Sequence, residues 1–135
     1  MLPTISSIVS VWPTEPEADP LGHWIRSCRK LIDLLDDDTL VLPSHGKPFR
    51  GAPERLQALL DEHDENLNGL QPLCQSPKRV IDTFELLFRS RINEGNLIIA
   101  TGEARAHLNT RVDRDVWAVS SGDYGVDWFE TRSAN

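Results

Sequence analysis

Apolar residues recur at helical spacing in two long segments of the chain. The first segment predicts a helix over residues 21–35, with Asp19 as its N-cap and Pro20 at the first helical position. A second helix is predicted from Pro53 to Leu70, with acidic residues on its solvent side. The two expected apolar stripes are Leu21, Trp24, Ile25, Cys28, Leu31, Ile32 and Leu35, and then Leu56, Leu59, Leu60, His63, Leu67 and Leu70.

Short runs rich in β-branched residues predict strands on either side of the first helix. These runs are Ile5–Val11 and Thr39–Leu42, and Pro43 ends the second. The acidic run at 36–38 indicates a solvated turn, and residues 43–51 have the composition of a loop. Residues 69–77 contain two prolines and are predicted to be a linker.

The pattern after residue 78 predicts shorter helices and a terminal hairpin. A helix over residues 80–88 and another over 97–110 are separated by a glycine-containing turn at 93–96. Two apolar runs, 116–119 and 126–129, flank a six-residue loop and predict a β-hairpin. The inward positions are expected to be Val80, Ile81, Phe84, Leu87, Phe88, Leu97, Ala100, Ala104 and Leu108.

Together these elements predict an α+β fold that is mainly helical. A strand–helix–strand unit over residues 1–51 precedes a helical linker and a winged-helix-like domain with a terminal hairpin over residues 52–135. The chain has 135 residues, a length typical of one domain or of one domain plus part of another. Its formal net charge of −7 argues against a strongly basic nucleic-acid binder and against an anionic membrane partner. The two cysteines, Cys28 and Cys74, are too few for a disulfide scaffold, and we expect reduced thiols in a cytoplasmic protein.

His45 is the first candidate for chemistry, because it follows the predicted strand 39–42 and precedes Gly46. A lone histidine there is more often packed or solvent-facing than a metal ligand. However, the segment Thr39-Leu-Val-Leu-Pro-Ser-His-Gly-Lys-Pro-Phe-Arg-Gly51 resembles the last metal-ligand motif of metallo-β-lactamase-fold hydrolases. Segments 54–67 and 102–108 resemble the helix that follows that motif and the third helix of a winged-helix appendage found in one branch of the family.

This resemblance implies a parent enzyme that hydrolyses an ester, thioester or phosphodiester with zinc or another divalent metal. In that family a His-x-His-x-Asp-His cluster, a further histidine, a bridging aspartate and a final histidine bind the metals. Only the final histidine has a counterpart here, His45, so the chain resembles the C-terminal third of such an enzyme. We expect His63 and His107 to be packing residues and His23 to lie on the surface, and hence no tight zinc or manganese site in the isolated chain.

These observations predict a C-terminal substrate-cleft or accessory domain that is inactive by itself. Arg105, Asn109 and Arg111 are candidates for substrate or nucleic-acid contact. Residues 78–132 carry eight basic and nine acidic side chains, a net charge of −1, which disfavours duplex DNA and leaves single-stranded RNA as one alternative. A second alternative is oligomerisation or docking onto an N-terminal hydrolase domain. Its expected apolar anchors are Trp12, Trp24 and Phe49.

Overall fold

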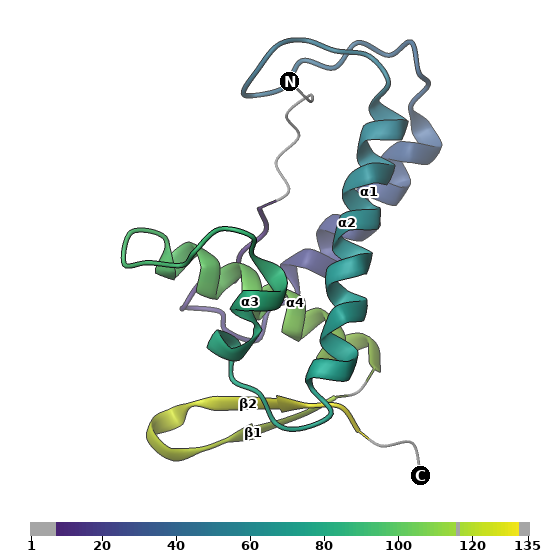
Figure 1. Ribbon diagram of the computed structural model, residues 1–135. Helices are drawn as coiled ribbons and strands as arrows, with labels where there is room; N and C mark the ends of the chain where they lie inside the picture. The colour runs from purple at the N-terminus through teal and green to yellow at the C-terminus, as the bar shows by residue number, and fades with distance from the viewer. Residues whose placement is uncertain (1–7, 116, 133–135) are drawn as a thin grey trace.

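The computed structural model describes residues 8–115 and 117–132. Two long helices, α1 (Pro20–Leu34) and α2 (Ala52–Leu73), run antiparallel, side by side, and are joined by the segment 35–51 at one end of the molecule (Figure 1). The short helix α3 (Phe84–Leu87) and helix α4 (Leu97–Asp115) pack against the other half of α2, and the 3₁₀ helix η1 (Val80–Thr83) packs against α4 and α3. Strands β1 (Ala118–Ser121) and β2 (Asp127–Glu130) lie at the opposite end, with the 3₁₀ turn η2 (Asp123–Gly125) between them (Figure 1).

The beginning of α1 confirms the capping predicted from the sequence. The Asp19 carboxylate accepts a hydrogen bond from the Gly22 backbone N–H at 2.9 Å, and Pro20 is the first helical residue. The same Asp19 oxygen accepts a hydrogen bond of 2.6 Å from the Thr110 hydroxyl on α4. One carboxylate therefore caps α1 and also joins it to a helix that lies about ninety residues further along the chain.

Helix α2 extends past the point where the linker was predicted to begin. All six residues of its predicted stripe are buried, which confirms that pattern. The prediction of a linker from Gly69 was wrong, because α2 continues through Pro72 to Leu73. Pro72 removes one backbone donor from the last turns. The burial of Leu70 and Cys74 in a hydrophobic cluster with Phe129 stabilises these turns despite the proline.

The strands predicted near the N-terminus do not form in the described part of the chain. Residues 8–11 belong to no strand, and residues 5–7 of that predicted strand lie outside the described residues. The segment 39–42 contributes only an isolated bridge, in which Val41 and Phe49 exchange two backbone hydrogen bonds of 2.8 and 3.1 Å. A strand needs a paired neighbour along its length. The Val11 N–H bonds instead to the Gly102 carbonyl of α4 at 3.0 Å.

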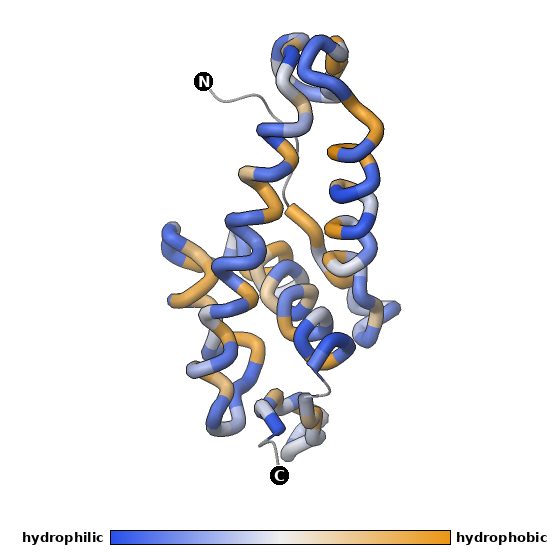
Figure 2. The backbone as a smooth tube through the Cα atoms, turned by 90° about the vertical axis from the view of Figure 1, so that its right-hand side faces the viewer, coloured by the Kyte–Doolittle hydropathy of each residue, from blue (hydrophilic) through white to orange (hydrophobic). Residues whose placement is uncertain are grey.

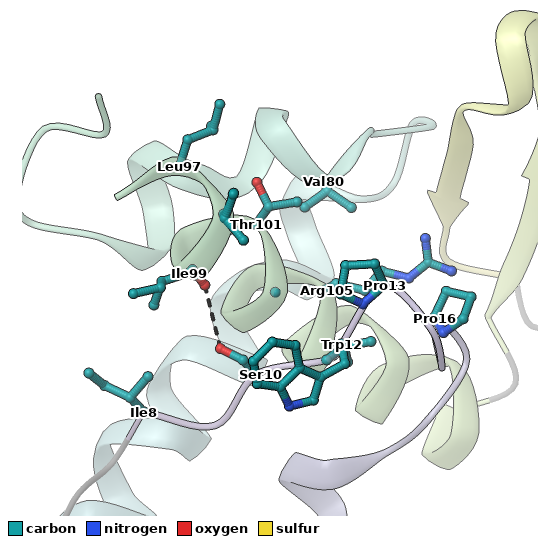
Figure 3. Close-up of a pocket in the computed structure, with 13 residues that line it drawn as sticks. Ile8, Ser10, Trp12, Pro13, Pro16, Val80, Leu97, Ile99, Thr101 and Arg105 are labelled. Atoms are coloured by element: carbon teal, nitrogen blue, oxygen red, sulfur yellow. Dashed lines mark hydrogen bonds between the residues drawn. The ribbon is translucent and has the colours of Figure 1, made fainter. Parts of the chain in front are cut away.

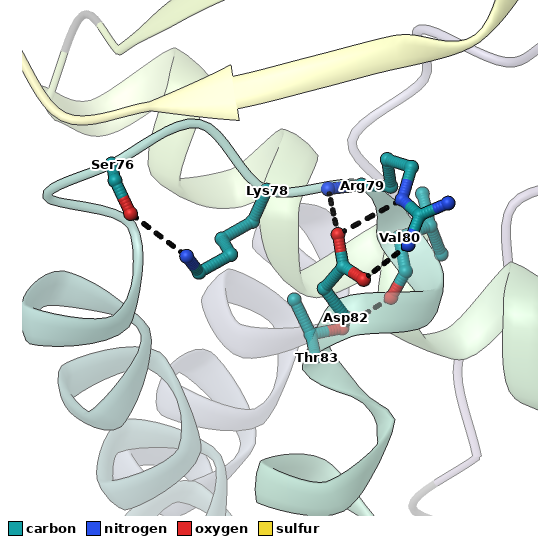
Figure 4. Close-up of polar contacts among 6 residues, drawn as sticks. All are labelled: Ser76, Lys78, Arg79, Val80, Asp82 and Thr83. Carbon is teal, nitrogen blue, oxygen red and sulfur yellow. Dashed lines mark hydrogen bonds and ion pairs between the residues drawn. The ribbon is translucent and has the colours of Figure 1, made fainter.

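The predicted helix at 80–88 divides into η1 and α3, and one of its expected inward positions, Ile81, is corrected. Ile81 is exposed, while Thr83 is fully buried and donates to the Val80 carbonyl. The Asp82 carboxylate accepts hydrogen bonds from the backbone and guanidinium of Arg79, which closes the start of η1 (Figure 4). Leu97, also expected inside, lies exposed at the start of α4.

The terminal hairpin forms as predicted: β1 ends two residues later and β2 begins one residue later than expected, and Val116 of the first predicted strand lies outside the described residues. Strands β1 and β2 pair antiparallel, with Val119 opposite Phe129. Lys78 adds a bridge on the other edge of β2 through two backbone hydrogen bonds with Phe129. The tip of the hairpin contains Tyr124 and Gly125 at positive φ. Helices followed by a hairpin agree with a mixed α and β class, whereas the finer winged-helix assignment stays a prediction.

Two hydrophobic clusters hold the elements together, and α2 contributes to both. The first joins α1 to α2 through Leu21, Ile25, Leu56 and Leu60, with Val11 at its edge. The second joins the end of α2 to α4 and the hairpin, and Phe129 is completely buried in it. Along α1 and α2 hydrophobic and hydrophilic segments alternate, as an amphipathic helix pair requires (Figure 2). The predicted boundary between residues 51 and 52 stays a prediction.

Candidate functional site

His45 lies on the loop at the free end of the α1–α2 pair. The Val41–Phe49 bridge closes this loop, and the Gly51 N–H donates to the Asp37 carbonyl at 3.0 Å. Gly46, next to His45, has a φ of 94°, a left-handed conformation that favours glycine. The His45 side chain is exposed. The loop therefore presents one accessible imidazole, which is a suitable single ligand for a divalent metal.

The surroundings of His45 do not complete a metal site. Within residues 8–115 and 117–132, no group of three or more histidine, cysteine, aspartate or glutamate side chains is arranged to hold a metal ion. A catalytic zinc needs about three protein ligands and an open position. The residues present therefore do not fit a complete zinc centre, and His45 can supply one ligand at most.

His63 and His107 meet in the interior, on facing surfaces of α2 and α4. His63 Nδ1 and His107 Nε2 are 3.2 Å apart. Trp24 packs edge-on against His63, with the ring centroids 5.1 Å apart. The Glu103 carbonyl lies 2.8 Å from His107 Nδ1 and can only accept a hydrogen bond, so His107 Nδ1 carries the proton. In neutral His107, Nε2 is then the acceptor for the His63 Nδ1–H. The packing role predicted for both histidines is confirmed.

Burial also sets the protonation of these interior groups. Burial lowers the pKa of His107 to about 4, and the nearby His63 also lowers it, whereas the hydrogen bond to the Glu103 carbonyl raises it. His107 is therefore neutral at pH 7. Burial raises the pKa of the Glu103 carboxyl, and the nearby charge of Glu62 adds to this. Cys28 and Cys74 are free and buried, and burial raises the pKa of both thiols, that of Cys74 to about 11. Such thiols are poor nucleophiles.

The three predicted contact residues of α4 are engaged within the protein. Arg105 pairs with Asp127 at 2.8 Å and donates from Nε to the Asn109 side-chain oxygen. Asn109 is buried and donates to the carbonyls of residues 16 and 18 at 2.9 and 2.8 Å. Arg111 pairs with Asp115, donates to Gln71 and lies over the Trp117 ring. All three side chains thus join α4 to neighbouring segments, and Arg105 also lines a pocket.

That pocket lies between the segment 8–16 and the first turns of α4 (Figure 3). Its volume is about 800 Å³, and most of its lining is apolar. The sequence pattern did not reveal this pocket, because the predicted helical face places Leu97 in the core and gives Ile98 and Ile99 no role. The available signal was the run of three consecutive apolar residues at the start of a helix, of which one helical face can bury only part.

Comparison with known protein families identifies the class of this chain. Residues 67–132 match the model of the metallo-beta-lactamase-like C-terminal domain, and this match begins within α2 and ends after β2. No curated protein matches the sequence. No helix in the described residues combines the length and hydrophobicity that crossing a membrane requires.

Solved structures extend the similarity to almost the whole chain. A beta-lactamase domain protein from Burkholderia ambifaria is 37% identical and superposes with a TM-score of 0.89 over 97% of this chain. A metallo-beta-lactamase family protein from Thermus thermophilus is 24% identical and shares the fold, with a TM-score of 0.72 over 96% of this chain. This chain spans 39% of the length of each. The chain therefore has the fold of a C-terminal metallo-beta-lactamase-like part, as the resemblance in the sequence predicted.

Proposed function

We propose that this chain serves as the C-terminal accessory part of a metal-dependent hydrolase of the metallo-beta-lactamase fold. Within such an enzyme it would contribute one metal ligand, His45, and part of the wall of the substrate cleft. The substrate class is an ester, thioester or phosphodiester, as the family resemblance implies, and the setting is the cytoplasm. The similarity to the Burkholderia ambifaria protein, of which this chain matches 39%, supports the proposal.

The observation that carries this proposal is the position of His45. Its imidazole is exposed on a closed loop, and the described residues bring no second and third donor beside it. The remaining ligands would have to come from a hydrolase domain or partner that is not among these residues. The metal supplied by that assembly would lower the pKa of a bound water to about 7. His45 would hold one coordination position through a ring nitrogen.

A chimera tests this role directly. In the Burkholderia ambifaria protein, the segment that matches this chain is replaced by this sequence, and metal content per chain is measured by elemental analysis. The same measurement is made with His45→Ala and with His23→Ala, which alters another exposed histidine of the same chain. We expect the chimera to retain metal, His45→Ala to lose at least half of it, and His23→Ala to match the chimera. Equal metal content in all three would refute the assignment of His45.

The isolated chain provides the complementary test. We expect it to contain well under one metal ion per chain after purification without chelator. About one retained ion per chain that disappears in His45→Ala would show that this chain completes a site by itself or across a subunit interface, and the accessory role would then be wrong.

Docking onto a hydrolase partner or a second copy is the second candidate function. Its support is an exposed apolar patch, the distal patch, at the free end of the α1–α2 pair. This patch contains Leu31, Leu34, Leu40 and Leu42, and Leu34 is 76% exposed. Of the three anchors predicted from the sequence, Trp12 is 73% exposed, whereas Trp24 and Phe49 are half-buried. Light scattering at high concentration tests this candidate, because a strictly monomeric mass would exclude self-association.

Contact with single-stranded RNA receives less support from the structure. The intramolecular bonds of Arg105, Asn109 and Arg111 would have to break or be shared before these side chains reached a nucleic acid. A filter-binding assay at low salt checks this. A dissociation constant below about 0.1 mM, the weak limit of non-specific binding, would restore the RNA interpretation.

A further inference from the structure

The pocket between residues 8–16 and α4 has the properties of a ligand site rather than of a packing defect. Its volume of about 800 Å³ falls within the range of small-molecule pockets, roughly 300–1,000 Å³. Apolar side chains form most of its wall, and Ser10, Thr101 and Arg105 supply the polar groups (Figure 3). A few polar groups in an apolar cavity are the usual arrangement for orienting a bound molecule.

Exposing the apolar wall of the pocket to water is unfavourable in free energy. Leu97, Ile98 and Ile99 are all exposed at the start of α4, Ile98 by 78%, and Trp12 lies on the facing segment with 73% of its surface exposed. Three consecutive exposed apolar residues on a helix contribute little to the fold. An exposed apolar patch of this kind marks a binding surface.

The pocket is formed without a ligand. The Val11 N–H bonds to the Gly102 carbonyl, and Asn109 holds the carbonyls of Pro16 and Ala18. Gly102 permits this approach, because a Cβ there would lie 2.8 Å from the Val11 oxygen. The segment 8–16 is thus held against α4 at Val11 and at Pro16, and a ligand would not need to order the residues between them.

Arg105 gives the pocket one cationic group. Its Nε and Nη1 atoms are engaged by Asn109 and Asp127, and its guanidinium lies over the Phe129 ring, 5.1 Å from the ring centroid. Among the described residues these partners leave Nη2 for a ligand oxygen. A carboxylate or other anionic oxygen is the natural partner for an oriented guanidinium.

We propose that this pocket binds an elongated apolar carboxylic acid, of the medium-chain fatty acid type, with its chain along Trp12 and Ile98 and its carboxylate at Arg105. A flexible alkyl chain can follow the apolar wall, and the acid group takes the remaining guanidinium donor. This proposal is independent of the metal-dependent hydrolysis proposed above, because none of its contacts involves His45.

Tryptophan fluorescence of the whole chain, titrated with decanoate at concentrations where the acid stays monomeric, tests the proposal. Trp12 borders the pocket, so binding shifts its emission, and the change is expected to be absent in Trp12→Phe. Each buried CH₂ contributes about 0.8 kcal/mol, so octanoate is expected to bind about tenfold more weakly than decanoate. Decanol, which lacks the charge, is also expected to bind about tenfold more weakly. Decanol tests the charge interaction in place of an Arg105 variant, because replacing Arg105 would also break its ion pair with Asp127.

Two matched variants locate the binding. Ile98→Ser removes an exposed apolar side chain from the pocket, and Leu34→Ser removes one of similar exposure from the distal patch. Both should fold, since neither side chain is buried. We expect Ile98→Ser to weaken decanoate binding about tenfold. We expect Leu34→Ser to leave binding unchanged.

Four results would overturn the proposal. They are the absence of a saturable change, equal affinity for decanoate and decanol, equal loss in the Ile98→Ser and Leu34→Ser variants, and a dimer that dissociates in Ile98→Ser. The last result would mean that a second copy covers the pocket. A defect in metal binding by the chimera would leave the fatty-acid result unaffected, so the two proposals fail separately.

Discussion

Replacing Gly102 by alanine tests how the segment 8–16 is held against α4. Gly102 lies in the second turn of α4 and is buried. An alanine Cβ at this position would be 2.8 Å from the Val11 carbonyl oxygen and 3.1 Å from Ser10 Cβ. Because the nearest atom belongs to the backbone, the segment must move away. The hydrogen bond of 3.0 Å from the Val11 N–H to the Gly102 carbonyl is then strained or lost.

Opposing effects decide the sign of the change in stability. In an uncrowded helix, alanine would stabilise the protein by about 1 kcal/mol relative to glycine. Overpacking costs about 1–3 kcal/mol, and loss of the hydrogen bond costs about 1 kcal/mol. The net expectation for Gly102→Ala is therefore a loss of about 2 kcal/mol in the free energy of unfolding.

Urea unfolding followed by circular dichroism measures this loss as a decrease of about 1 M in the midpoint. Gly69→Ala is the matched control, because Gly69 also lies inside a helix and its nearest neighbour is the Leu86 side chain, at 3.1 Å. That side chain can move, so Gly69→Ala should be neutral or stabilise by up to about 1 kcal/mol. If Gly102→Ala were as stable as the wild type, the close approach of residues 10–11 to α4 would be refuted.

Three further measurements examine the interior. The pKa of His107 is about 4 in the folded chain and higher when unfolded, so its contribution to stability is complete above about pH 6.5 and decreases by up to about 3 kcal/mol as the pH falls to 4. Urea unfolding of wild type and of His107→Gln at each pH measures this decrease as a difference between the two proteins. The difference removes the opposing effect of Glu103, which both proteins contain. Asp19→Ala should lower the free energy of unfolding by about 2 kcal/mol, because it removes both the cap of α1 and the acceptor for Thr110, whereas Asp19→Asn should lower it less. Equal unfolding midpoints for Asp19→Ala and wild type would contradict this. Cys74, with a pKa of about 11, should not react with an aromatic disulfide reagent at pH 8 until urea unfolds the chain, and rapid reaction of the native protein would show that its burial is incomplete.

Local patterns in the sequence predicted the long helices well. The stripe of α2, the Asp19 cap and the hairpin depend on interactions between residues close in sequence or on a simple apolar periodicity. The buried state of His63 and His107 followed from their helical positions. The chain's resemblance to metallo-beta-lactamase-fold proteins followed from several segments in the correct order, one of which contains His45.

Contacts between distant segments account for what the sequence did not reveal. Whether residues 39–42 form a strand depends on a neighbouring strand, and the described chain provides only the Val41–Phe49 bridge. Arg105 and Asn109 were predicted to make outward contacts. Their actual partners, Asp127 and the carbonyls of residues 16 and 18, are distant in sequence, so no local pattern indicates them.

The sequence by itself determined the amphipathic helices, the hairpin and the resemblance to the metallo-beta-lactamase fold, because each is encoded in spacing or in a contiguous motif. The tertiary structure alone decided that the segment 8–16 lies across the start of α4. Contact through Gly102 brings the two segments together although about ninety residues separate them. The pocket and the pairing of the two interior histidines both follow from such long-range packing, which no local pattern specifies.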